Sequence, residues 1–233
     1  MITHQEQQAI WEREHQNPLV LLQMDAKHAS SGVVPFWQWL QQHGATLPLQ
    51  GIEMGCGKGR NALWLAGQGV AMTGFDFSAA AIAEATHRKQ EQECGDLAQF
   101  VVHDATLPWP WKVDTFNFGI DCFASTDIET PQGRQAAVQE LHRVLKPGGY
   151  VLAYLLSTDD EFHKEMIMQF PTQEVNTFLH PTTGKFEKAF DREEVLSLYQ
   201  GFQLVEERRM NKKTMFFNTE YSCSHLWMVF KKI

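Results

Sequence analysis

Patterns of strand and helix alternate through the middle of the chain, and this alternation restricts the fold more than any other feature of the sequence. Short apolar runs typical of strands are separated by segments whose apolar residues recur at helical spacing. The expected strands span residues 51–54, 70–75, 100–103, 116–120 and 150–156. The expected helices span residues 33–43, 60–66, 79–93, 131–145 and 192–199. This order predicts an α/β fold with a doubly wound, mostly parallel sheet.

Capping residues mark where some of these helices begin and end. Ser78 is expected to cap the third helix, and Thr130 precedes a proline at the first helical position of the fourth. Lys146-Pro147-Gly148-Gly149 is expected to end that helix. Two β-rich stretches at 202–208 and 226–231 are close enough to pair antiparallel, although the linker between them is long for a tight hairpin.

Four acidic residues fall at corresponding places in this pattern. Each lies at, or within two residues of, the end of a successive expected strand: Glu53, Asp76, Asp104 and Asp121. Ligands of open α/β sheets bind outside the carboxyl ends of the strands. One acid at a solvated strand end means little, but four at the same structural position indicate a common binding site.

A glycine-rich loop follows the first of these strands. In Gly55-Cys56-Gly57-Lys58-Gly59 the glycines allow the backbone to approach a ligand closely and to adopt positive φ. A dinucleotide fingerprint would need glycine or alanine where Arg60 stands. A phosphate-binding P-loop would need Gly-Lys-Ser or Gly-Lys-Thr, which Gly59-Arg60-Asn61 does not supply. The loop therefore indicates a ligand without a pyrophosphate.

Composition excludes several classes of partner. The 20 basic and 28 acidic residues give a net charge of −8, which argues against broad binding to nucleic acid or to an anionic membrane. The four cysteines (Cys56, Cys94, Cys122, Cys223) form no Cys-x-x-Cys pair, so we expect no metal site and a reducing, cytoplasmic environment. The polar start lacks a signal-peptide pattern, and no apolar run approaches the ~20 residues that a membrane helix needs.

Taken together, these motifs resemble those of the class I S-adenosylmethionine-dependent methyltransferases. The matching segments are Glu53-Met54-Gly55-Cys56-Gly57-Lys58-Gly59, Gly74-Phe75-Asp76-Phe77-Ser78, His103-Asp104-Ala105, Asp121 and Leu145-Lys146-Pro147-Gly148-Gly149. The resemblance is strong over about residues 48–156 and implies a Rossmann-like sheet of seven strands, the last of them antiparallel. Within the superfamily, Cys56 to Asn61 and Trp64 to Gly69 look most like small-molecule branches, of the tellurite-resistance or thiopurine type.

The resemblance implies roles for the residues at the methionine and ribose end of S-adenosylmethionine. The backbone of Gly55, Cys56 and Gly57 would pack against the methionine and ribose. Glu53 would brace this loop and lie within reach of the amino group. Asp76 would accept hydrogen bonds from both ribose hydroxyls, because carboxylates accept from such donors.

Further roles are implied at the adenine and around the cofactor. Phe77 would flank the adenine ring, and Asp104 would take its amino group with the Ala105 backbone beside it. Asp121, or the backbone near it, would face the methionine end. Trp11 would fold over the cofactor as part of an N-terminal cap, or else serve as a plain core anchor.

We expect one domain over residues 1–233 with four parts. These are an N-terminal helical cap at 1–46, a cofactor-binding half at 47–156, a lid-like insertion at 157–190, and a C-terminal helix and strand pair at 191–233. The insertion lies where such enzymes often carry a substrate lid.

Catalytic residues are harder to identify than cofactor residues. Asp121 and His180 are weak candidates, since a histidine titrates near neutrality. A surface position is the default for His180 and for His163 in the same insertion. Cys122 and the residues around it lack the motifs of cytosine C5 methyltransferases and of amino methyltransferases acting on DNA bases or protein glutamine.

The function predicted from the resemblance is direct SN2 transfer of a methyl group from S-adenosylmethionine to a small-molecule acceptor, which leaves S-adenosylhomocysteine. A general base is needed only if the acceptor loses a proton. The alternative is a non-catalytic module that binds S-adenosylmethionine and regulates or activates a partner. A nicotinamide-dependent oxidoreductase is a third reading, disfavoured by Arg60.

Overall fold

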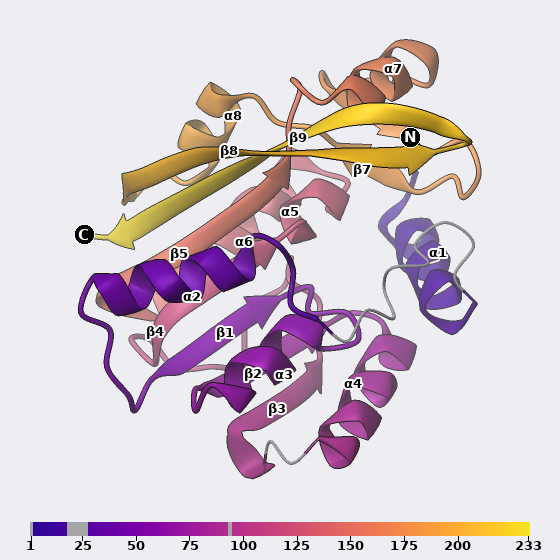
Figure 1. Cartoon of the computed structure of the whole chain (residues 1–233). Coiled ribbons are helices and arrows are strands. Elements are labelled where there is room, and N and C mark those ends of the chain that lie inside the picture. The colour runs from indigo at the N-terminus through magenta and orange to yellow at the C-terminus, as the bar shows by residue number, and fades with distance from the viewer. Residues whose placement is uncertain (1, 18–27, 93–94) are drawn as a thin grey trace.

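The computed structural model describes residues 2–17, 28–92 and 95–233, with a seven-stranded sheet at the centre (Figure 1). The strand order is β3-β2-β1-β4-β5-β9-β8. The strands are β1 (Gln50–Met54), β2 (Ala71–Asp76), β3 (Ala98–Val102), β4 (Phe116–Cys122), β5 (Leu145–Leu156), β8 (Phe202–Phe216) and β9 (Thr219–Lys232). A separate pair, β6 (Thr177–Leu179) and β7 (Phe186–Lys188), forms a small antiparallel sheet.

The direction of the strands confirms the predicted fold class. The first five strands pair in parallel, whereas β9 runs antiparallel to both β5 and β8. The sheet is therefore the mostly parallel, seven-stranded, Rossmann-like sheet with an antiparallel last strand.

Helices cover both faces of the sheet. One face is packed by α2 (Val33–Gln42) and α3 (Arg60–Gly67), and the other by α6 (Pro131–Val144) and α8 (Arg192–Leu198). The helix α4 (Ala79–Glu91) contacts β2 and β3, and a short 3₁₀ helix at Gly95–Leu97 precedes β3. As predicted, Ser78 caps α4 and Thr130 caps α6 with a proline in its first turn.

Two boundaries differ from the sequence predictions. The helix α6 ends at Val144, and β5 begins at once with Leu145 paired to Phe116; the segment expected to end the helix is looped out before Tyr150 pairs with Phe118. The expected long linker between the last two strands is also wrong. Both strands extend into a tight hairpin whose loop is only Phe217 and Asn218, each with positive φ (48° and 62°). Positive φ at both central residues matches the twist of the flanking strands.

The segment after β5 contains regular structure of its own. It holds α7 (Glu161–Gln169) and the β6–β7 pair, and the end of the β8–β9 hairpin reaches over it (Figure 1). Phe162 and Phe178 are buried in a small cluster with Phe216 and Tyr221 of the hairpin. These aromatic side chains hold the segment against the hairpin.

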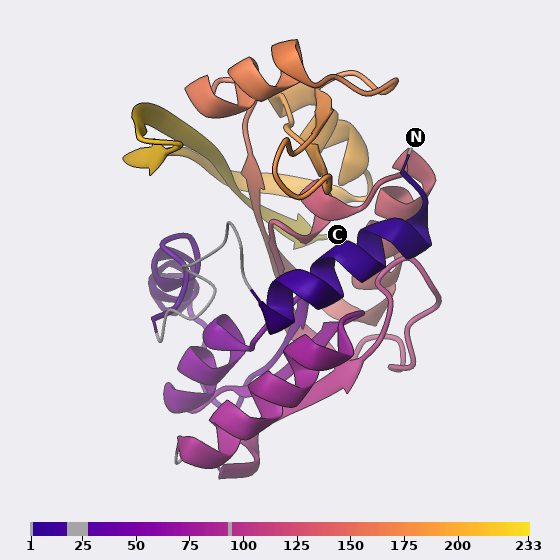
Figure 2. The ribbon, with the colours of Figure 1, turned by 90° about the vertical axis from the view of Figure 1, so that its right-hand side faces the viewer.

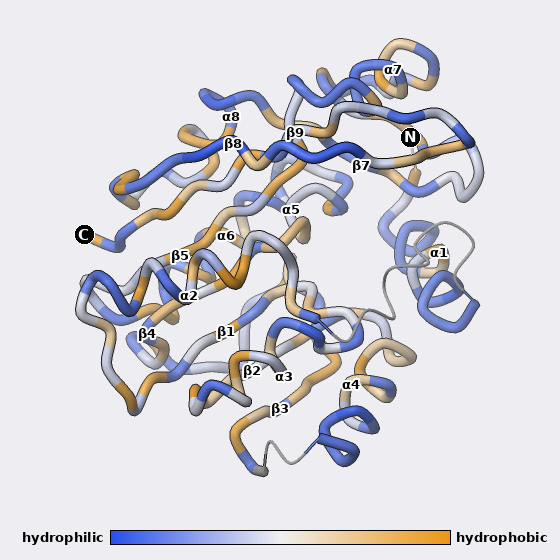
Figure 3. Tube along the Cα trace, viewed as in Figure 1, coloured by the Kyte–Doolittle hydropathy of each residue, from blue (hydrophilic) through white to orange (hydrophobic). Residues whose placement is uncertain are grey.

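Hydropathy follows the layers of the fold. Figure 3 shows apolar residues along the central strands and hydrophilic residues along much of β8. The strand β8 lies at the edge of the sheet, where charged side chains discourage pairing with another chain. Within the described parts of the chain, no helix combines the length and apolar character needed to cross a membrane.

Candidate functional site

The carboxyl ends of β1, β2, β3 and β4 bring the four predicted acids to one edge of the sheet. β1 pairs with β2 on one side and with β4 on the other, so the strand order reverses between β1 and β4. Such a reversal opens a crevice where ligands of α/β sheets bind. The helix α1 (His4–Gln16) lies across this edge, as Figure 2 shows.

The glycine loop adopts the left-handed backbone that its composition predicts. Gly55, Gly57 and Gly59 have φ of 61°, 52° and 77°. A Cβ atom on Gly55 would lie 2.7 Å from the Cβ of Ala124, and one on Gly57 would lie 3.4 Å from Cε1 of His15. Glycine is therefore required by both conformation and space at Gly55.

Asp76 organises the ends of β1 and β2. Its Oδ2 accepts a hydrogen bond from the Gly57 N–H (2.9 Å), and its Oδ1 accepts one from the Ser78 N–H (2.9 Å). The side chain is only 7% exposed, and burial raises its pKa although His15 nearby opposes this. Each carboxylate oxygen accepts more than one hydrogen bond, so Asp76 keeps capacity for a ligand.

Glu53 lies deeper beneath the loop. Asn61 Nδ2 donates to Glu53 Oε1 (2.7 Å), and Asn61 Oδ1 in turn accepts from the Ser30 N–H (2.7 Å). The other oxygen, Oε2, has no hydrogen-bond partner among the described residues. Burial raises the pKa of Glu53 to about 7. An unpartnered buried carboxylate oxygen is a place for a donor of a ligand.

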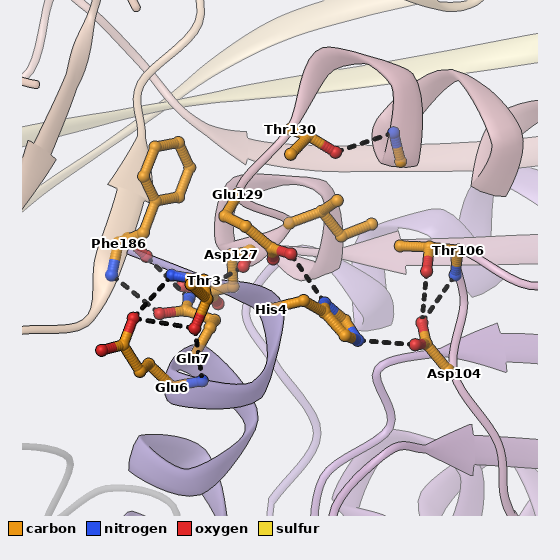
Figure 4. A network of polar contacts seen from close by, with 12 residues as sticks. Thr3, His4, Glu6, Gln7, Asp104, Thr106, Asp127, Glu129, Thr130 and Phe186 are labelled. Carbon is orange, nitrogen blue, oxygen red and sulfur yellow. Dashed lines mark hydrogen bonds and ion pairs between the residues drawn. The ribbon is translucent and has the colours of Figure 1, made fainter. Parts of the chain in front are cut away.

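Asp104 is held in the loop after β3 and contacts α1. Its Oδ1 accepts from the N–H and the hydroxyl of Thr106 (2.8 Å each), and its Oδ2 lies 2.6 Å from His4 Nε2 (Figure 4). Beside it, the Ala105 carbonyl accepts from Trp109 Nε1 (3.0 Å). The Phe77 ring lies 6.3 Å from the His4 ring. Both predicted adenine neighbours therefore lie next to His4.

Asp121 is placed differently from the other three acids. It is fully buried, and its oxygens accept from the Ser125 N–H (3.0 Å), the Ser125 hydroxyl (2.5 Å) and the Tyr199 hydroxyl (2.8 Å). Burial raises its pKa. Ser125 belongs to α5 (Ala124–Asp127) and Tyr199 ends α8, so Asp121 ties these two helices to β4, and its geometry favours a positioning role over a catalytic one.

Of the α1 residues at this edge, only Trp11 was predicted from the sequence as part of the site. Glu12 accepts from the Ser78 hydroxyl (2.6 Å) and the Ala80 N–H (3.1 Å) at the start of α4. Gln7 bonds the Asp127 carbonyl (2.8 Å) and both backbone groups of Phe186 (3.0 Å to the carbonyl and 2.9 Å from the N–H). One local signal was present: Thr3 and Glu6 form a capping box that starts α1.

One family model matches the middle of the chain. Residues 52–149 match the family model described as "Methyltransferase domain". This stretch, which is less than half of the chain, is therefore similar to a methyltransferase domain. No curated protein matches the chain in sequence.

Solved structures share the fold of this chain at low sequence identity. A SAM-dependent methyltransferase from Methanosarcina mazei is 22% identical, with a TM-score of 0.73 over 83% of this chain and 97% of that one. Burkholderia thailandensis 1,6-didemethyltoxoflavin-N1-methyltransferase, solved with 1,6-didemethyltoxoflavin and S-adenosylhomocysteine, is 16% identical (TM-score 0.68; 100% and 91% covered). The [4+2]-cyclase SpnF is 15% identical (TM-score 0.71; 97% and 96% covered). Because one fold can host several chemistries, the shared fold does not determine the function, which must be argued from the site.

Beside the edge of the sheet that carries Asp76, a second group of buried polar residues lies between α1, α5 and the β6–β7 pair. Lys185 Nζ lies 2.5 Å from Glu187 Oε1 and 4.6 Å from the centre of the Trp11 ring. Asp127 is near enough to Lys185, Glu187 and Asp76 for their charges to act on it, and burial raises its pKa well above the usual range. This group is therefore continuous with the edge that carries Asp76.

Three polar atoms of this second group have no hydrogen-bond partner among the described residues. They are Trp11 Nε1, Thr126 Oγ1 and Asp127 Oδ1. Buried polar atoms are normally paired, so each such atom needs an explanation, and a bound ligand is one.

The two histidines of the insertion are not on the surface, which corrects the default expectation. His163 and His180 are 4% and 3% exposed. His163 Nδ1 lies 2.7 Å from Asp160 Oδ1, and His180 Nδ1 accepts from the Thr182 N–H (3.3 Å). Burial lowers the pKa of His180, so its ring is expected to be neutral at about pH 7. It borders the second group, close to Lys185 and Glu187.

The predicted absence of a metal site stays a prediction for the whole chain. Within the described ranges, no group of three or more His, Cys, Asp or Glu residues could hold a metal ion. Cys56, Cys122 and Cys223 are free thiols, whereas Cys94 lies outside the described residues.

Proposed function

We propose that this protein transfers a methyl group from S-adenosylmethionine to a small-molecule acceptor by direct SN2 displacement. The observation that carries the proposal is that Glu53 and Asp76 both lie at the carboxyl ends of neighbouring parallel strands. Both carboxyl groups are buried, and Glu53 Oε2 has no partner among the described residues. A ligand with an ammonium and a diol would supply the donors that such groups need.

The residues of the edge fit S-adenosylmethionine group by group. Asp76 would hold the ribose hydroxyls, Glu53 would face the methionine ammonium, and the side-chain-free backbone of Gly55 to Gly57 would lie against the ligand. Asp104 would take the adenine amine, with Phe77 and the Ala105 backbone beside the ring. When bound, S-adenosylmethionine supplies a methyl group already activated by its sulfonium.

The same proposal places the acceptor in the second polar group, with residues 157–190 as its lid. Trp11 and Thr126 offer unpaired polar atoms to a polar acceptor, and Asp127 Oδ1 is the atom we assign to take a proton from an acceptor that has one to lose. Asp127 fits this task better than Asp121, which has three protein donors, or His180, which already accepts from Thr182. The chain's own work is to align the partners and exclude water.

A binding measurement tests the cofactor assignment. Calorimetric titration of the purified protein with S-adenosylhomocysteine should show a binding site, and Asp76→Ala should weaken the affinity at least about tenfold, because a charge-assisted pair of hydrogen bonds is lost. Asp96→Ala, at an exposed acid in the 3₁₀ helix before β3 and so at the opposite end of that strand from Asp104, is the matched control. Unchanged affinity in Asp76→Ala would refute the assignment.

A transfer measurement separates an enzyme from a binding module. Labelled methyl transfer would be screened over thiols, phenols, amines and metalloid oxyanions. Transfer to one class, reduced in Asp127→Asn while cofactor affinity is kept, supports the proposed reaction. Cofactor binding without transfer to any of these classes would favour the non-catalytic module.

A further inference from the structure

His4 is held between two carboxylates that come from different parts of the chain. Its Nε2 lies 2.6 Å from Oδ2 of Asp104, in the loop after β3. Its Nδ1 lies 2.6 Å from Oε1 of Glu129, in the segment between α5 and α6. Figure 4 shows the imidazole ring bridging the two acids. The first residue of α1 is thus tied to both sides of the cofactor edge.

This geometry specifies the charge of the ring. A neutral imidazole carries one N–H, so it can donate to only one of the two carboxylates; two short contacts to carboxylates require the imidazolium. Partial burial lowers the pKa of His4, but Glu129 and Asp104 outweigh it and the pKa is raised above its usual value. The His4 side chain is 38% exposed, so solvent weakens but does not remove these ion pairs.

The rest of α1 lies over the proposed cofactor residues. Gln8 Nε2 donates to the Phe77 carbonyl (3.3 Å), and Glu12 holds the start of α4 through Ser78 and Ala80. His15 stands over Gly57 and near Asp76, and its Nδ1 has no partner among the described residues. The inner side of α1 therefore offers an unpaired polar atom toward the same edge.

We propose that His4 is a positioning residue of the cofactor site, a latch that joins the start of α1 to Asp104 and Glu129 when its ring is protonated. The latch closes α1 over the bound cofactor and orients the Asp104 carboxylate toward the adenine amine. This inference rests on the proposed function. Its consequence is a part of the cofactor affinity that is lost as the pH rises through the pKa of His4.

Few charged groups face His4, but other groups of the site titrate in the same range. The facing groups are Asp104 from the loop after β3 and Glu129 from the segment before α6, while Glu6 of α1 is bound to Thr3 and Phe77 contributes only a ring. Glu53, with a pKa of about 7, would ionise over the same range. The pH profile of the wild type alone would mix these effects, so the ratio between variant and wild type is the informative quantity.

The test measures the affinity for S-adenosylhomocysteine by calorimetry at about pH 6 and about pH 8.5, on either side of a raised histidine pKa. His4→Gln and Glu129→Gln each keep a polar side chain but remove one charge of the latch. We expect both to bind about fivefold more weakly than the wild type at the lower pH and within about twofold of it at the higher pH. His87→Gln, an exposed histidine of α4, should match the wild type at both.

A second readout needs no ligand. In an NMR titration of the ligand-free protein, the His4 ring should titrate above the ordinary histidine value, and Glu129→Gln should lower its pKa. The latch is overturned if His4 titrates at or below the ordinary value, or if the affinity ratio of His4→Gln to wild type is the same at both pH values. Absence of S-adenosylhomocysteine binding by the wild type at both pH values would instead overturn the proposed function itself.

Discussion

Glu53 has a carboxyl group that folding moves from water into a buried position. Its pKa rises from 4.5 to about 7, chiefly through burial. Between these values the folded protein holds a proton that the unfolded chain has lost, so the free energy of unfolding falls as the pH rises. In Glu53→Gln this titration is absent, and we expect the variant to gain about 2–3 kcal/mol relative to wild type between about pH 5 and about pH 8.

Urea unfolding of both proteins at the two pH values measures this difference. The comparison within each protein cancels any constant effect of the substitution on packing. An identical stability difference at both pH values would contradict the raised pKa.

The sequence could place Glu53, Asp76 and Asp104 at one edge because each is counted from the end of a strand. It could not pair His4 with its two acids, which lie 100 and 125 positions away along the chain. No periodicity links residues at such distances; only the path of α1 across the sheet does. Asp121, which with the backbone near it was expected to face the methionine end, is bound by three protein donors because Ser125 of α5 and Tyr199 at the end of α8 both reach it.

Among the elements, the β8–β9 hairpin gives a direct test of backbone conformation. Asn218 has a φ of 62°, which asparagine tolerates and β-branched residues do not. Asn218→Val should therefore lower the free energy of unfolding by about 1–2 kcal/mol, and Asn218→Gly should keep or slightly raise it. Thr219→Val, one residue later at the start of β9, is the matched control and should lose no stability.

Thermal or urea unfolding of the three variants checks this prediction. Equal losses in Asn218→Val and Thr219→Val would show that the turn does not have this conformation in solution.

Element prediction worked where periodicity and caps agree and failed where they do not. The central strands and α3, α4 and α6 were expected within a few residues of their observed bounds, because buried apolar runs alternate with capped helices. The antiparallel pairing of the last two strands is confirmed, but their length and tight turn were missed because β8 is a mostly exposed edge strand whose polar residues resemble a linker. In the turn, Phe217 is an unusual residue for positive φ, so the usual Asn-Gly signal was absent.

At the scale of the whole molecule, the buried Lys185–Glu187 pair connects segments that lie far apart in the sequence. Glu187 belongs to β7 and Lys185 directly precedes that strand, Lys185 lies over the Trp11 ring of α1, and Asp127 of α5 is near both charges. Nearby, Gln7 ties α1 to α5 and β7 through three hydrogen bonds. The proposed lid and cap therefore share one polar core, so we expect them to unfold with the domain.

Breaking this pair should destabilise the whole domain. Lys185→Met leaves Glu187 and Asp127 buried without their cation, and losing one partner of a buried ion pair costs about 3 kcal/mol or more. Lys185 also keeps the pKa of Glu187 low despite burial, and that stabilisation is present above the unfolded pKa and fades as the pH falls. The loss of stability in Lys185→Met should accordingly shrink in mildly acidic solution, where Glu187 can take up a proton, and Lys185→Met/Glu187→Gln should recover most of it.

Lys213→Met is the matched control: it removes an exposed pair with Glu220 of similar length (2.7 Å) and should lose less than about 1 kcal/mol. Urea unfolding of the four proteins at neutral and mildly acidic pH measures these effects, and equal losses for Lys185→Met and Lys213→Met would show that the buried pair does not join the cap and lid to the domain.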